Sequence, residues 1–245
     1  MKVFNQPAYT LLNRPYSETS LIVEVFSRDY GRIGLMAKGA RRLKSKLKGV
    51  LQPFQPILVS WTGKGEVPTL TSAEIDQSEF NLLHHDLRGD SLVCGFYCNE
   101  LLISLLHRYD PHIQLFQKYH ETILALNDTV ADRALADSMR GFEQAIMRET
   151  GYELSFLTEA DGKTMISDNQ YYVFQAAEGF VRLAGDQANA VQGRVIKSLH
   201  GAELAKTEPE IAAQAKLLMR EILAKTLGNK KITSRELFFP KQRVE

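Results

Sequence analysis

TSLIVEVFSRDYGRIGLMAKG, residues 19–39, is the stretch that decides the fold of the first third of the chain. Its first part, residues 19–27, is rich in the β-branched and aromatic side chains that strands favour. In its last part, residues 31–39, Ile33, Leu35 and Ala37 fall on one face and the residues between them on the other. This period of two predicts a strand with one buried side and one side facing solvent.

Three further strands are predicted around this pair, at residues 8–13, 50–61 and 67–75. Five short strands joined by Gly, Pro and Asp turns suit a small closed β-barrel. The OB-fold is the nucleic-acid-binding example of such a barrel, and a five-stranded SH3-like barrel fits the same pattern.

After about residue 80 the apolar residues recur with a helical period. Helices are predicted over residues 91–109, 113–126, 131–151 and 208–228, and a small hairpin within residues 171–183. We therefore expect an α+β chain with an N-terminal OB-fold β-barrel over residues 1–80. A mostly helical C-terminal domain with a small β-hairpin is expected over residues 81–245.

The composition is that of a globular protein. Hydrophobic residues make up 44% of the 245, and no apolar run approaches the roughly 18 residues that span a bilayer. The N-terminus has neither the apolar core nor the cleavage site of a signal peptide, and two cysteines do not make a disulfide framework. The expected compartment is the cytoplasm, and no membrane is expected as a partner.

Positive charge is concentrated at the start of the chain. Residues 1–50 hold ten Lys and Arg against three Asp and Glu, whereas the formal net charge of the whole chain is only +1. Six of these cations lie in KGARRLKSKLKG, residues 38–49, which has no acidic residue and is predicted to be a loop between two barrel strands. Such a loop lets several cations converge on a phosphate chain, and binding then releases condensed counterions.

Two other interpretations of this stretch stay open: a solvated loop that only aids solubility, and a basic localisation signal. Binding of single strands would also need aromatic side chains on which bases stack. The candidates are Tyr16, Phe26, Tyr30, Phe54 and Trp61, of which Tyr16 and Tyr30 stand beside polar turn residues.

No catalytic or metal-binding motif is present in the sequence. It has no P-loop, HExxH or GxSxG pattern. Cys94 and Cys98 are four residues apart without a CxxC pair, and the preceding His84 and His85 are adjacent, which is poor geometry for zinc. A non-catalytic binder without a cofactor is therefore favoured, and a metal-dependent nuclease and an RNA-binding OB protein are the alternatives.

Several segments together resemble the RecO family of bacterial recombination mediators, most of all its gamma-proteobacterial members. In the family's order and over nearly the whole chain, they are RPYSETSLIVEVFSRDYGRIGLMAKGARR, LKGVLQPFQPI, GKGEVPTLTSAE, YCNELL, GYELSF and SRELF. The resemblance implies an N-terminal OB domain, a helical bundle and, in many members, a zinc-binding element.

The resemblance also implies a function in DNA repair without catalytic residues, in the cytoplasm at the nucleoid. Such a protein binds single-stranded and double-stranded DNA and anneals complementary strands. It docks on the C-terminal tail of single-strand-binding protein, and with RecR it promotes the loading of RecA.

By position, the resemblance implies DNA contacts from Arg32, Lys38, Arg41, Arg42, Lys44, Lys46 and Lys48. Arg14 extends this set if it lies on the same barrel face. The resemblance assigns the partner's tail to the helical domain, where Arg140 is the first candidate and Arg148 the second.

The chain departs from its zinc-bearing relatives in one region. Those relatives have two CxxC pairs shortly after a Gly-Tyr, which here is Gly151-Tyr152, but residues 151–190 contain no cysteine. We therefore expect a degenerate zinc-finger-like region that holds itself together by packing, without a metal.

Overall fold

The computed structural model describes residues 1–80, 87–127, 132–176, 178–185, 187, 189–202, 207–228 and 232–234. It divides into two compact units. The first unit is Met1–Thr129 with Ile232–Glu245, and the second is Val130–Lys231. Each unit is described by itself.

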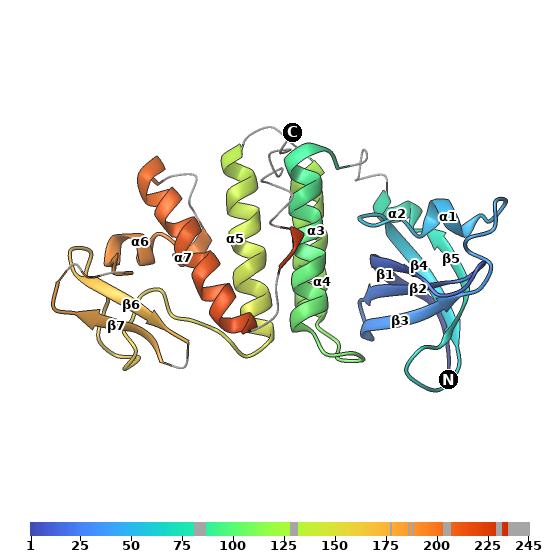
Figure 1. The fold of residues 1–245 in the computed structure, drawn as a ribbon, viewed down its shortest axis with the longest axis horizontal. Coiled ribbons are helices and arrows are strands. Elements are labelled where there is room, and N and C mark those ends of the chain that lie inside the picture. The colour runs from blue at the N-terminus through green and yellow to red at the C-terminus, as the bar shows by residue number, and fades with distance from the viewer. Residues whose placement is uncertain are drawn as a thin grey trace, which may run out of the picture. The chain divides into compact units, whose positions relative to one another are not determined.

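The first unit contains a closed five-stranded barrel with the strand order β1-β2-β3-β5-β4. Figure 1 shows these strands in blue to cyan, curled around a common interior. The strands are β1 (Lys2–Pro15), β2 (Leu21–Ser27), β3 (Gly31–Ala37), β4 (Pro56–Thr62) and β5 (Thr69–Ile75). The barrel closes by antiparallel pairing of β1 with β4 and by a parallel contact between β3 and β5. The α+β prediction with an OB-type barrel is confirmed.

The alternation in β3 sets the interior of the barrel. Ile33, Leu35 and Ala37 are fully buried, as predicted, and pack with Val23 and Val25 of the paired strand β2. The turn between these strands needs a glycine: Gly31 has a φ of 67°, and a Cβ there would lie 1.9 Å from the carbonyl oxygen of Asp110.

The strand predicted over residues 50–61 begins later, at Pro56, and a single helical turn α1 (Leu47–Val50) precedes it. Pro53 and Pro56 have no N–H to donate to a ladder, and Phe54 between them has a φ of 69°. These three residues prevent continuous pairing, so the strand starts at the second proline.

Two helices pack on the outside of the barrel within the first unit, α3 (Gly89–Leu105) and α4 (Ile113–Asn127). A short helix α2 (Gln77–Phe80) follows β5. Tyr9 of the barrel stacks edge-on against Tyr119 of α4 at 5.1 Å, and Asn99 of α3 donates to the Leu11 carbonyl oxygen at 3.0 Å. These contacts explain why α3 and α4 group with the barrel, although the sequence suggests a domain boundary near residues 78–90.

The segment Ile232–Ser234 also belongs to the first unit because Glu100 of α3 binds it. The Glu100 carboxylate accepts hydrogen bonds from both the backbone N–H and the hydroxyl of Thr233 and of Ser234, at 2.7–2.8 Å. Burial of the carboxylate opposes its ionisation, but these hydrogen bonds outweigh that effect and lower the pKa of Glu100.

The second unit combines helices with a three-stranded sheet in the order β7-β6-β8. Its elements are α5 (Asp132–Glu149), β6 (Tyr171–Gln175), β7 (Gly179–Leu183), β8 (Val191–Gln192), α6 (Gly193–Lys197), the 3-10 turn η1 (His200–Ala202) and α7 (Pro209–Leu227). The predicted hairpin is present as β6 and β7, drawn in orange in Figure 1. Lys225 of α7 donates to the Phe174 carbonyl oxygen at 2.8 Å, which ties α7 to β6.

A carboxylate is buried between the barrel and the chain that leaves α3. Glu24 of β2 is 4% exposed and forms ion pairs with Arg108 and, at 4.0 Å, with Arg32. A charge removed from water in this way is stable only while its partners remain.

Replacing Glu24 with alanine is expected to lower the free energy of unfolding of the first unit by about 3 kcal/mol, because it leaves two neighbouring guanidinium groups without their carboxylate. Urea unfolding followed by tryptophan fluorescence measures this, since the single tryptophan, Trp61, lies in the barrel. Asp29→Ala is the matched control: Asp29 is 40% exposed in its pair with Arg28, and its loss should cost less than about 1 kcal/mol. Equal losses for the two variants would contradict the buried role of Glu24.

Candidate nucleic-acid interface

The six cations of the predicted loop are all exposed in the structure. The segment Lys38–Lys48, here called the basic loop, leaves β3 and runs into α1. Its cations are Lys38, Arg41, Arg42, Lys44, Lys46 and Lys48. The loop is made of successive turns, in which Arg42 N–H donates to the Gly39 carbonyl oxygen at 3.1 Å and Ser45 N–H to that of Arg42 at 3.0 Å. The backbone is therefore held in place while the charged side chains point to solvent.

The basic loop is anchored at both ends and beside the β1–β2 turn. Ala40 and Leu51 are 1% exposed and belong to the barrel core. Arg41 N–H donates to the Thr19 carbonyl oxygen at 3.0 Å, and the Arg41 guanidinium donates to that of Ser17. The loop and the turn at residues 16–20 therefore form one continuous surface on the barrel.

Among the described residues, none of the six loop cations forms an ion pair with a carboxylate. Other arginines of the chain do: Arg28 pairs with Asp29, and Arg182 pairs with Glu159. Six positive charges in one short segment repel one another, and a bound polyanion would relieve that repulsion. This arrangement suits a chain of phosphates.

Arg14 lies in register with Met36 across the strands β1, β2 and β3. It is exposed near the end of β1 and is opposite Ile22 of β2, which is in turn opposite Met36 of β3. Lys38 lies just after β3, which ends at Ala37, in the first turn of the basic loop. Besides burial, the nearby charges of Arg108 and Arg14 lower the pKa of Arg32, so Arg14 lies on the face of the sheet that carries Arg32.

Arg32 is placed differently from the other predicted DNA contacts. It lies at the start of β3, whereas Lys38 follows the end of that strand. Its side chain is 17% exposed beside Glu24, and burial lowers the pKa of the guanidinium. A DNA contact from Arg32 stays a prediction, and the ion pair with Glu24 competes with it.

Of the five aromatic candidates for base stacking, Tyr16 is the one with an open ring, 63% exposed in the turn beside Arg41. Phe26 and Trp61 are buried. The ring of Tyr30 packs edge-on against Trp61, and that of Phe54 against Phe96, both at 5.1 Å. The other four rings pack inside or against the barrel, so their faces are not open for base stacking.

The two arginines predicted to hold a partner's tail differ in exposure. Arg140 is 7% exposed and forms an ion pair with Glu143, three residues later on α5. Arg148 is exposed near the end of the same helix. Arg148 is therefore the one that a peptide can reach directly.

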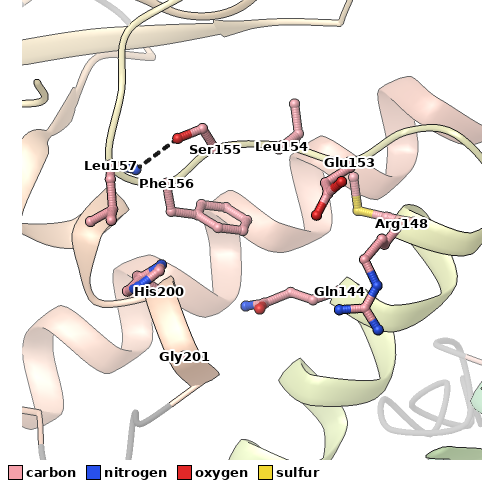
Figure 2. A pocket seen from close by; sticks show the side chains of 10 residues that line it. Gln144, Arg148, Glu153, Leu154, Ser155, Phe156, Leu157, His200 and Gly201 are labelled. Atoms are coloured by element: carbon pink, nitrogen blue, oxygen red, sulfur yellow. Dashed lines mark hydrogen bonds between the residues drawn. The ribbon is translucent and has the colours of Figure 1, made fainter. Parts of the chain in front are cut away.

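Arg148 lines a pocket of about 580 Å³ in the second unit. Its lining residues are Gln144, Met147, Arg148, Glu153, Leu154, Ser155, Phe156, Leu157, His200 and Gly201. Figure 2 shows the Phe156 ring lying over Gln144, with Arg148 and Glu153 on one side and His200 on the other. The sequence did not indicate this pocket, because its walls come from α5, the segment that follows α5, and the distant turn η1.

The region after Gly151-Tyr152 packs around aromatic side chains. Phe156, Phe174 and Phe180 are buried together, with ring centroids 5.7–6.1 Å apart. The Asp161 carboxylate accepts hydrogen bonds from Lys163 N–H and Thr164 N–H at 2.8–2.9 Å and closes the loop at residues 159–164. These contacts hold together the cysteine-free segment that follows Gly151-Tyr152.

Cys94 and Cys98 are buried on α3. Within the part of the chain that the structure describes, no three His, Cys, Asp or Glu side chains come together to hold a metal ion. His84 and His85, and the terminal segment from residue 235, lie outside the described residues. None of the helices described is both long and apolar enough to cross a membrane.

Comparison with known proteins gives matches over nearly the whole chain. The family model described as "Recombination protein O N terminal" matches residues 1–78, and "Recombination protein O C terminal" matches residues 87–236. The chain is 40% identical to the DNA repair protein RecO of Dechloromonas aromatica, over 97% of this chain and 96% of that protein. It is also 40% identical to the DNA repair protein RecO of Nitrosococcus oceani, over 97% and 93%. With that of Burkholderia lata the identity is 38%, over 99% and 84%.

Proposed function

The chain belongs to the RecO family of DNA repair proteins, and from that premise we propose that it is a non-enzymatic recombination mediator. In this proposal it binds single-stranded and double-stranded DNA, anneals complementary strands and acts in the cytoplasm at the nucleoid. The observation that carries the proposal is the basic loop, whose six exposed cations have no carboxylate partner among the described residues.

The basic loop binds the phosphate backbone and not a base sequence. Lys and Arg side chains on a turn-rich loop bind phosphates at variable spacing, and such contacts carry no sequence information. The loop also has a role in annealing. When its cations bind one DNA strand, they partly neutralise that strand and so weaken its repulsion of a complementary strand. Arg14 and Tyr16 extend the surface along the β1–β2 turn.

The second unit receives the C-terminal tail of single-strand-binding protein, and the family's further partners are RecR and, indirectly, RecA. Supporting this, the pocket beside α5 combines the exposed Arg148 with the apolar side chains of Met147 and Phe156. A cation next to an apolar wall suits a peptide that ends in acids and a phenylalanine. Arg140 lies one turn before Gln144 on the same helix, and its pair with Glu143 makes it a support for that wall.

Replacing Arg41, Arg42, Lys44 and Lys46 with alanine is expected to flatten the salt dependence of binding to a single strand. Each phosphate contact contributes about −0.7 to the slope of log K against log salt, so the slope should fall from roughly −3 or −4 to about −1. Fluorescence anisotropy with an oligothymidylate at several salt concentrations measures it.

The matched control for this experiment compares two double variants. One combines Lys44→Ala and Lys46→Ala in the loop, and the other combines Lys163→Ala and Lys216→Ala. Lys163 and Lys216 are exposed in the second unit, so the second pair changes the net charge equally without touching the loop. An unchanged slope in the loop variants, or the same change in both pairs, would mean that the loop is a bystander.

Arg148→Glu is expected to weaken binding of a short peptide of aspartates with a terminal phenylalanine about tenfold, because it puts a like charge beside the peptide's acids. Its affinity for naked DNA should stay the same. Arg194→Glu is the control, since Arg194 is exposed on α6 and makes the same change in charge. Loss of both peptide and DNA binding in Arg148→Glu would place the two ligands at a shared site or indicate misfolding.

A nuclease and an RNA-binding protein are the alternatives, and two measurements separate them from a mediator. End-labelled DNA incubated with the pure protein and Mg²⁺ is expected to stay intact. Single-stranded DNA should compete at least as well as RNA of equal length, because phosphate contacts do not select the sugar. Cleavage that a single Asp or Glu substitution abolishes, or a strong preference for RNA, would overturn the proposal.

A further inference from the structure

One apolar side chain of the basic loop, that of Leu43, is exposed to solvent among the cations. Leu43 lies between Arg42 and Lys44 and is 97% exposed, the largest exposed fraction among the large apolar side chains that the structure describes. The next two leucines behave differently: Leu47, the first residue of α1, is half-buried against the barrel, and Leu51, which follows α1, is 1% exposed. Leu43 thus contributes nothing to the packing of the fold.

The backbone around Leu43 holds this side chain away from the barrel. Leu43 is a central residue of the turn that the hydrogen bond from Ser45 N–H to the Arg42 carbonyl oxygen closes at 3.0 Å. The preceding turn is closed by Gly39 and Arg42, and Arg41 is tied to the β1–β2 turn. Since the loop is anchored on both sides of Leu43, the leucine does not need a large rearrangement to meet a ligand.

The neighbours of Leu43 define which ligand can cover it. Arg42 and Lys44 are exposed and have no carboxylate partner among the described residues, so they select a polyanion. A leucine gains free energy only when an apolar surface covers it. A nucleic-acid strand offers both surfaces within a few ångströms, because the flat faces of its bases lie next to its phosphates.

We propose that Leu43 is a base-contacting wedge, which inserts between neighbouring bases of a single DNA strand while Arg42 and Lys44 hold the flanking phosphates. The inference rests on the proposed DNA binding by the basic loop and adds the base contact to it. Apolar side chains that insert between base steps are a known way for proteins to unstack them. Tyr16, 63% exposed in the turn bound to Arg41, offers a second apolar surface nearby.

With such a wedge, the free energy of binding has a part that depends on salt and a part that does not. The phosphate contacts weaken as salt rises, since they depend on counterion release. The contact between Leu43 and a base neutralises no charge, so it should persist at high salt. A single inserted leucine also leaves most bases of the strand free to pair with a complementary strand.

The test compares two probes that differ only in their bases: an oligothymidylate and a strand of abasic residues of equal length and charge. The wild-type protein should bind the oligothymidylate about tenfold more tightly, and Leu43→Ala should reduce this ratio to about twofold with an unchanged salt slope. Leu217→Ala is the matched control, because Leu217 is 63% exposed on α7 in the second unit. It should leave the ratio at the wild-type value.

A second variant, Leu43→Lys, is expected to change the affinity for the abasic strand and the preference for oligothymidylate in different ways. It removes the wedge and adds one cation, so it should bind the abasic strand more tightly and prefer oligothymidylate less, with the slope steeper by about 0.7. Since Leu43 is almost fully exposed, neither change should alter the thermal unfolding of the barrel.

Two results would overturn the wedge. One is a preference for oligothymidylate that stays about tenfold in Leu43→Ala. The other is an equal loss of affinity for both probes, which would assign the leucine to loop conformation or to a ligand other than bases. Both leave the salt slope intact and so leave the proposed function standing. A slope that does not respond to the charge substitutions would instead remove the proposed function itself.

Discussion

Closure of the five-stranded barrel around the inward face of β3 is the constraint on which the rest of the first unit depends. Ile33, Leu35 and Ala37 enter the core, and the parallel contact of Met36 with Thr69 of β5 closes the sheet. The chain that leaves β3 must then emerge at the rim of the barrel. Ala40 and Leu51 hold this segment against the core, and all six cations of the basic loop are exposed to solvent.

Two populations of cations follow from this arrangement. Arg32, Arg108 and Arg140 are partly or fully buried. Arg32 and Arg108 pair with Glu24 and so join different elements, whereas Arg140 pairs with Glu143 within α5. The loop cations have no carboxylate partners among the described residues and are exposed to solvent, although the Arg41 guanidinium also donates to the Ser17 carbonyl oxygen. Removing a paired cation affects folding, because its carboxylate remains buried, whereas a free cation can be lost with little effect on stability. The arginines that form buried ion pairs are therefore different from those proposed to bind DNA, so each set can be varied without the other.

In the second unit, aromatic packing holds the segment after Gly151-Tyr152 against the hairpin. Buried rings of Phe156, Phe174 and Phe180 fill its centre, and the hydrogen bonds to Asp161 close its loop. The same segment leaves Phe156 at the edge of the pocket that Arg148 lines. Packing of aromatic side chains here both stabilises the hairpin and forms one wall of this pocket.

The sequence by itself determined the class of fold, the hairpin of the second unit and the position of the basic loop. Those features rest on local signals: a period of two in β3, a helical period after residue 80, and six cations without an acid among residues 38–49. Only the tertiary structure decided which predicted side chains are accessible. In the structure Phe26 and Trp61 are buried, whereas Tyr16 and Leu43 are exposed. Arg140 forms an ion pair with Glu143, and Arg32 lies beside Glu24. The physical reason is that burial and ion pairing depend on residues far apart in the chain, such as Glu24 and Arg108, whose proximity no local pattern encodes.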